Sequence, residues 1–165
     1  MNEAQQAILK EMEEILQESS EAEQQILSTT LKAIRQKRHD PGSYLSCFLG
    51  VEESFIDEKT YQIVVPVTPF MWNPLGIVHG GITASIADTA MGMLVTHKLP
   101  DHQDSVTTEM KLNYISPGIG KKLICQAVLL HMGRKLSVCE CKITNEKGRL
   151  IATASGSFYI IDKKK

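Results

Sequence analysis

The stretch that decides the fold runs from Asn73 to Met93 and reads NPLGIVHGGITASIADTAMGM. Its opening Asn-Pro and Gly favour an extended or turning backbone. The residues after His79-Gly80-Gly81 are rich in Ala, Ile and Met, which predicts a helix that begins near the glycines. Apolar side chains would point in nearly every direction around this helix, so we expect it to lie buried in the middle of the domain.

Asp88 is the one carboxylate in this helix. No Lys or Arg occurs between Lys59 and Lys98, so no nearby cation in the sequence can pair with it. A buried carboxylate is costly unless it is hydrogen-bonded or used in chemistry. The helix alone leaves two interpretations open: a reactive group, or a polar side chain at the helix edge that Thr and Ser hydroxyls satisfy.

The other end of the helix favours the reactive interpretation. Free backbone N–H groups of Gly80 and Gly81, together with the positive end of the helix dipole, would form a site for an oxyanion. At about 1.5 Å per residue, Gly80 and Asp88 are about 12 Å apart along the axis, so one chain cannot bring both to one reacting atom. The spacing predicts a homodimer with antiparallel helices and two shared sites.

The sequence resembles the PaaI-like group of hotdog-fold acyl-CoA thioesterases from Tyr44 to Ile161. The resemblance is carried by Asn73, Gly76, His79-Gly80-Gly81, Ala87-Asp88 and Gly92, followed in order by TTEMKLNYISP, HMGRKLSVCECKI and GRLIATASGSF. It implies an α+β hotdog fold, in which an antiparallel sheet wraps around a long central helix. It also implies hydrolysis of acyl-CoA to free acid and coenzyme A without a cofactor, in a dimer of dimers.

The resemblance assigns roles within the site. It implies that the Gly80 N–H polarises the thioester carbonyl, and that Asp88 acts as general base or as nucleophile. Asn73 matches the family position that holds a water or the thioester near the carboxylate. His79 lies beside the oxyanion donor, although a His before Gly-Gly equally suits a helix cap. Thr107 matches a Ser or Thr that faces the carboxylate, and Thr is also a common strand residue.

Three further residues are candidates for substrate binding. Gly81 follows Gly80 at the start of the helix. Arg134 and Lys135 lie in a Gly-Arg-Lys turn and are candidates to contact the coenzyme A phosphates, since both side chains bind phosphate well. The alternative for this pair is ordinary solubility of an exposed turn.

Two rival functions remain open. One is a hotdog hydratase or dehydratase, which usually pairs a catalytic His with an acid in other motif contexts. The other is a noncatalytic acyl-CoA binding protein that uses its N-terminal helix for assembly. The arrangement of His79-Gly80-Gly81 and Asp88 argues against the first, and the presence of Asp88 and Asn73 argues against the second.

The whole chain sets outer limits. Its 165 residues suffice for one domain with an extension. A formal net charge of −1 gives no bulk attraction to nucleic acid or to an anionic membrane. The four cysteines show no metal-ligand spacing, so we expect no metal and reduced thiols in a cytoplasmic protein. No export signal or long apolar run is present, so we expect no membrane span.

The chain divides near residue 40. Residues 2–37 contain no Gly or Pro and repeat apolar residues at spacings of three and four, which predicts amphipathic helix with a break near Ser19-Ser20. We expect this helix to lie across its own domain, since its heptad is short and irregular. Asp40-Pro41-Gly42 then separates an N-terminal helical extension, 1–40, from the hotdog domain, 41–165.

The core domain alternates polar and apolar residues on both sides of the central helix. This period of two predicts two strands before the helix and four after it. The expected strands are 48–56, 60–67, 105–115, 122–132, 136–144 and 150–161. Asp57-Glu58-Lys59 is expected to form the loop of the first hairpin.

Overall fold

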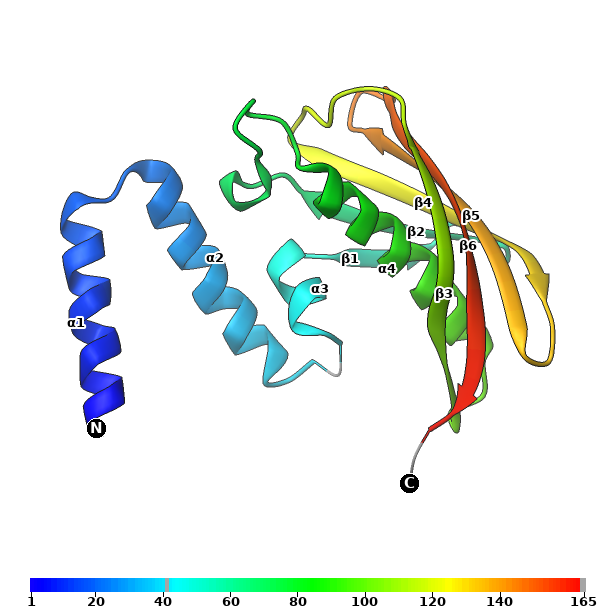
Figure 1. The fold of residues 1–165 in the computed structure, drawn as a ribbon, viewed down its shortest axis with the longest axis horizontal. Coiled ribbons are helices and arrows are strands. Elements are labelled where there is room, and N and C mark those ends of the chain that lie inside the picture. Colours follow the sequence, from blue (N-terminus) through cyan, green and yellow to red (C-terminus); the bar gives the residue numbers. More distant parts are fainter. Residues whose placement is uncertain (41, 164–165) are drawn as a thin grey trace. The chain divides into compact units, whose positions relative to one another are not determined.

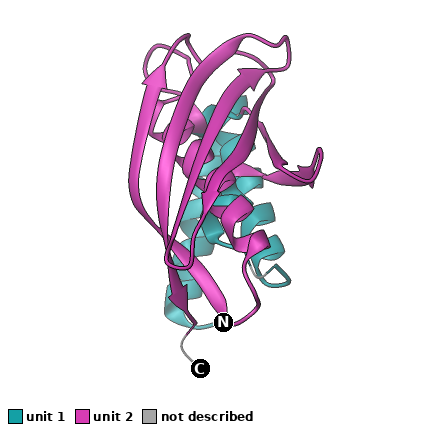
Figure 2. Cartoon of the chain, turned by 90° about the vertical axis from the view of Figure 1, so that its right-hand side faces the viewer, with its two compact units in different colours: residues 1–48, 68–70 teal, residues 49–67, 71–165 magenta. Residues whose placement is uncertain are grey.

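A computed structural model describes residues 1–40 and 42–163, so Pro41 of the predicted boundary lies outside the described residues. The chain forms two compact units (Figure 2). Unit 1 comprises residues 1–48 and 68–70, and unit 2 comprises 49–67 and 71–165. The functional division at residue 40 stays a prediction.

Unit 1 is helical. Helix α1 spans Glu3–Glu18 and helix α2 spans Glu21–Lys37, so the predicted break at Ser19-Ser20 is confirmed. Each helix begins with a capping box. The N-cap side chain accepts a hydrogen bond from the backbone N–H three residues later, and the side chain of that later residue accepts one from the N-cap backbone N–H. Ser20, the N-cap of α2, therefore starts a new helix where the sequence pattern weakens.

The predicted strand 48–56 is wrong over its first half. Helix α3 occupies Tyr44–Leu49, and strand β1 is only Glu52–Phe55. The Ser43 hydroxyl accepts a hydrogen bond from the Ser46 N–H at 3.0 Å, which caps a helical turn. Gly50 follows with φ of 62°, a left-handed conformation that suits glycine and ends the helix.

Unit 2 contains one antiparallel six-stranded sheet with the order β1-β2-β4-β5-β6-β3 (Figure 1). The other five predicted strands are confirmed to within two residues at each end. They are β2 Thr60–Pro66, β3 Gln103–Tyr114, β4 Lys122–Met132, β5 Leu136–Asn145 and β6 Leu150–Asp162. The β1–β2 hairpin closes around residues 57–59, as expected.

The central helix α4 spans Gly80–Lys98 and contacts every strand from β2 to β6. The sheet curves around it, which is the predicted hotdog architecture (Figure 1). One side of α4 is buried in the core, through Thr83, Ile86, Ala87, Ala90, Met91, Leu94 and Val95. The sequence predicted that α4 would be buried on all sides. In one chain this is wrong for the opposite side, which includes Asp88 and Gly92 and is only half-buried.

Strand β3 positions the site because it lies at the end of the sheet and runs antiparallel to α4. Its first residues lie beside the end of the helix, where Thr96 bonds Asp104, and its last residue, Tyr114, bonds Gly80 at the helix start. Within the described residues β3 pairs only with β6, so its outer edge has no strand beside it.

Candidate active site

The loop before α4 is folded around the side chain of Asn73. Asn73 Oδ1 accepts hydrogen bonds from the N–H groups of Leu75, at 2.9 Å, and Ile77, at 3.4 Å. Gly76 has φ of 70° and donates its N–H to the Asn73 carbonyl, which closes the turn. The oxygen of the Asn73 amide is thus used within the loop, and its nitrogen is the end left to meet a ligand.

His79 is the N-cap of α4. Its ring Nδ1 accepts a hydrogen bond from the Gly81 N–H at 2.9 Å, and its backbone N–H donates to the Met71 carbonyl at 2.8 Å. The expectation of two free N–H groups is therefore wrong for Gly81, whose N–H is occupied by the cap. A Cβ at Gly81 would lie 3.1 Å from this Nδ1, so the close cap favours glycine. The cap interpretation of His79 is confirmed.

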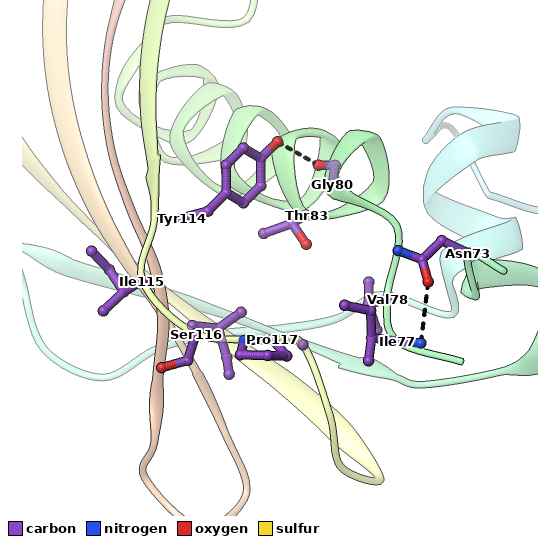
Figure 3. Close-up of a pocket in the computed structure, with 11 residues that line it drawn as sticks. Asn73, Ile77, Val78, Gly80, Thr83, Tyr114, Ile115, Ser116 and Pro117 are labelled. Carbon is purple, nitrogen blue, oxygen red and sulfur yellow. Dashed lines mark hydrogen bonds between the residues drawn. The ribbon is translucent and has the colours of Figure 1, made fainter. Parts of the chain in front are cut away.

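Gly80 keeps its N–H available. It is the first residue of α4, and its N–H has no acceptor within the described part of the chain. Its carbonyl accepts a hydrogen bond from the Tyr114 hydroxyl at 2.8 Å (Figure 3). A Cβ at Gly80 would lie 3.1 Å from that hydroxyl oxygen, so glycine lets the β3 tyrosine reach the helix.

Tyr114 is a site residue that the sequence interpretation missed. It occurs in the quoted segment TTEMKLNYISP, but nothing in that segment shows that the strand ends beside the first turn of the helix. Finding Tyr114 would have required knowing that β3 runs antiparallel to α4. That arrangement depends on the pairing of segments that lie far apart in the sequence. The Tyr114 hydroxyl holds the Gly80 carbonyl, which shares a peptide plane with the Gly81 N–H, and so ties the first residue of α4 to the end of β3.

A cavity of about 420 Å³ opens at this end of α4 (Figure 3). The loop, the first helical turn and the end of β3 line it. Its polar members include the Asn73 amide and the hydroxyls of Thr83, Tyr114 and Ser116, and its other lining residues are Ile77, Val78, Gly80, Ile115, Pro117, Gly118 and Ile151. A mostly apolar hollow with a few polar groups around a free N–H is suited to an acyl or thioester group.

Asp88 lies outside that cavity, two turns further along the helix. Asp88 Oδ1 accepts a hydrogen bond from the Thr107 hydroxyl at 2.7 Å, and its side chain is half-buried. The structure thus brings Asp88 and Thr107 together and keeps both apart from Asn73 and Gly80. The described chain therefore holds two separate groups of predicted site residues, Asp88 with Thr107 and Asn73 with Gly80, and sharing of a site between chains stays a prediction.

Arg134 and Lys135 lie in the turn between β4 and β5. The Lys135 carbonyl accepts a hydrogen bond from the Ile160 N–H at 3.0 Å, and Ile160 pairs with Ser105 at the beginning of β3. The turn is therefore at the Asp88 end of the sheet, remote from Gly80. Lys135 Nζ lies 5.9 Å from the ring centroid of Tyr159, within cation–π range.

None of the four cysteines lines the cavity. Cys47, Cys125, Cys139 and Cys141 are all free and buried. Burial, with the neighbouring Cys141, raises the pKa of Cys139 to about 12, which makes that thiol unreactive at neutral pH. Among residues 1–40 and 42–163, no three His, Cys, Asp or Glu side chains are grouped to hold a metal ion. None of the helices described is long and apolar enough to cross a membrane.

Comparison with known proteins matches residues 75–152 to the thioesterase superfamily. The proofreading thioesterase EntH of Cronobacter turicensis is 30% identical over 109 residues, which cover 64% of this chain and 77% of that protein. The medium/long-chain acyl-CoA thioesterase YigI of Escherichia coli is 24% identical over 128 residues, covering 68% of this chain and 82% of that protein.

A solved structure from Bacillus halodurans, crystallised with CoA, superposes with a TM-score of 0.84. It is 33% identical, and the match covers 90% of this chain and 99% of that one. The PaaI protein of Escherichia coli superposes with a TM-score of 0.68 at 22% identity, over 82% of this chain and 98% of that one, which shows the shared fold. The chain therefore belongs to the thioesterase superfamily, as a PaaI-like member with the hotdog fold.

Proposed function

We propose that this protein hydrolyses acyl-CoA thioesters to the free acid and coenzyme A. The observation that carries the proposal is the position of Gly80 at the start of α4: it lines a cavity fit for an acyl thioester, and its N–H meets no acceptor among the described residues. Relatives named as thioesterases and a similar structure solved with CoA support the same chemistry.

The reaction needs a polarised carbonyl and a nucleophile. The thioester oxygen accepts the Gly80 hydrogen bond, and the helix dipole stabilises the negative charge that develops there. Asp88 either removes a proton from the attacking water or attacks the carbonyl carbon itself. The C–S bond then breaks and the coenzyme A thiolate leaves. An anhydride formed by direct attack is hydrolysed by water in a second step.

Two chains supply one site in this proposal. The outer edge of β3 pairs antiparallel with β3 of a second copy, so that a continuous sheet joins both protomers. Because α4 runs along β3, the same two-fold axis places Asp88 of one copy near Gly80 of the other. Thr107 then orients the carboxylate from the same chain as Asp88, and Asn73 holds the water or the thioester from the chain that supplies Gly80.

The remaining residues support this arrangement. His79 and Gly81 shape the helix start through the cap, and Arg134 and Lys135 contact the coenzyme A phosphates. Residues 41–165 form the thioesterase domain, with 1–40 as an extension. The free cysteines suit a reducing compartment, which is consistent with a cytoplasmic protein.

Release of coenzyme A from a panel of acetyl-, hexanoyl-, palmitoyl- and phenylacetyl-CoA, followed with a thiol reagent, tests the proposal. We expect turnover of at least one of these substrates above the spontaneous rate. A hydratase would instead consume an enoyl-CoA with no free thiol, and a binding protein would retain acyl-CoA unchanged. Either of these outcomes, without thiol release, would exclude thioester hydrolysis.

A further inference from the structure

Helix α1 presents an apolar stripe that is left open. Ile8, Met12 and Ile15 follow one another at spacings of four and three, with Leu9 and Leu16 beside them. None of the residues in α1 is buried, and the side chains of Ile8 and Ile15 are 57% and 44% exposed. A helix of this length is marginal in water unless its apolar face is covered.

Helix α2 carries a second stripe with the same spacing. Leu27, Leu31 and Ile34 repeat the steps of four and three, and the last two are 43% and 38% exposed. This stripe is distinct from the face that holds the buried Ala33. The two stripes therefore stay largely open, although only two residues join the helices.

The charges of the two helices explain why one copy does not close them. Helix α1 contains five glutamates and one lysine, and most of these acids lie in its C-terminal half. Helices α1 and α2 run in opposite directions (Figure 1), so the short connection joins the acidic end of α1 to the first turn of α2, which contains Glu21 and Glu23. Like charges gathered at this connection oppose close packing of the two helices within one chain.

The basic half of α2 lies at its other end. Its last turns and C-cap hold Lys32, Arg35, Lys37 and Arg38, with no acidic residue between Ser28 and Arg38. The connection at Ser19-Ser20 keeps the acidic half of α1 in the same chain away from this region. The α1 helix of a second copy has no such restriction.

We propose that α1 of one copy packs on α2 of a second copy, and reciprocally, so that the two hairpins form a four-helix bundle. A parallel register sets Ile8, Met12 and Ile15 opposite Leu27, Leu31 and Ile34, in the alternating a and d positions of a heptad. In the same register Glu11 lies at a g position and Arg35 at the facing e position of the other helix. Ion pairs between such positions select the partner and the register of a coiled coil. This contact is separate from β3 pairing, so it joins two hotdog dimers into a tetramer.

Charge exchange between two full-length variants tests the contact. Glu11→Lys and Arg35→Glu should each have the mass of a dimer in light scattering, where the unaltered protein has that of a tetramer. Mixing the two variants should restore the tetramer, since acidic and basic helices again face one another in both contacts. If the mixture stays dimeric, the helices are covered within their own chain, and the proposal is wrong.

An apolar variant and a matched control add a second measurement. Ile8→Glu/Ile15→Glu should dissociate the tetramer, whereas Gln6→Glu, which adds charge on the opposite side of α1, should leave it intact. Thioester cleavage should be unchanged in every one of these variants, because none of the altered residues lines the cavity. A tetramer that persists in Ile8→Glu/Ile15→Glu, or an unaltered protein no larger than a dimer, would overturn the proposal. Neither result would bear on the hydrolysis itself.

Discussion

The Thr107 hydroxyl donates a hydrogen bond of 2.7 Å to Asp88 Oδ1, from the edge strand β3 to the central helix α4. The second carboxylate oxygen of Asp88 accepts no hydrogen bond from the described residues, and the residue is half-buried. The bond from Thr107 agrees with the structural interpretation, in which a hydroxyl satisfies the carboxylate, and the reactivity of Asp88 stays a prediction.

Asp88→Asn should fold normally and lose most of its turnover. The amide keeps the shape of the side chain but neither accepts a proton nor attacks a carbonyl. Loss of a general base typically lowers kcat by about 10²- to 10⁴-fold. Circular dichroism and thermal unfolding would confirm the fold before kinetics. If Asp88 is only structural, the variant should instead be at least as stable and equally active.

Thr107→Val should lower kcat with little change in KM. Valine keeps the branched shape but removes the donor that orients Asp88, and a hydrogen bond to a charged group contributes about 1.5–3 kcal/mol. That range corresponds to a decrease of roughly ten- to a hundredfold. Thr107→Ser, which keeps the hydroxyl, is the matched control. Equal kinetics for Val and Ser would show that the hydroxyl has no part in the reaction.

Tyr114→Phe should reduce kcat by up to about tenfold, because a neutral hydrogen bond contributes about 1 kcal/mol. The ring would remain against Gly80, but the helix start would lose the donor to its first carbonyl. Tyr159→Phe, in the exposed part of β6, is the control and should behave like the unaltered protein. A fall in thermal stability without any kinetic change would assign Tyr114 to folding alone.

Arg134→Ala should weaken the use of coenzyme A thioesters more than that of pantetheine thioesters. The proposed contact is with phosphate near the surface, so the loss should lie mainly in KM and should shrink at high salt. Arg149→Ala, in the β5–β6 connection, provides a matched arginine. Similar losses on both substrates, or in both variants, would show that Arg134 makes no specific contact with the nucleotide part of coenzyme A.

Mixed dimers would show whether the site is shared between chains. Gly80→Val should be inactive, because even a Cβ at this position lies 3.1 Å from the Tyr114 hydroxyl oxygen. A heterodimer of Gly80→Val with Asp88→Asn has one site with both defects and one with neither. Activity should return toward about half that of the unaltered dimer, by two-fold symmetry.

Circular dichroism of Gly80→Val and a tagged pull-down of the mixed species come first in that experiment. They establish that the variant folds and that the subunits exchange. Mixed dimers that form and stay inactive would place both groups of the site in one chain, and the antiparallel arrangement of the helices would be wrong.

The fold could be predicted from the sequence where one local signal dominates. His79-Gly80-Gly81 marks the helix start because capping depends on adjacent residues, and the alternation in β4 and β5 reports a sheet with one buried side. The predicted strand 48–56 was wrong over its first half, because no single local signal dominates there. Its apolar residues fit a period of two as well as a short helix, and the Ser43 cap decided between them.

The candidate site was less accessible to prediction, because its geometry is not local. Gly81 was expected to offer its N–H, yet whether a His side chain turns back to accept it depends on a rotamer that the sequence does not specify. Tyr114 contacts Gly80 across 34 positions of the chain. Only the pairing of β3 with β6 and its run along α4 bring the two together.

The position of β3 at the sheet edge has a consequence for synthesis on the ribosome. Its only neighbour in the described chain, β6, is the last strand to be made, so β3 emerges while neither of its edges can be paired within the chain. Unpaired strand edges in nascent chains promote aggregation. Until Leu150–Asp162 leaves the exit tunnel, we expect α4, which is made just before β3, to cover only one face of that strand, so that both of its edges stay accessible during synthesis.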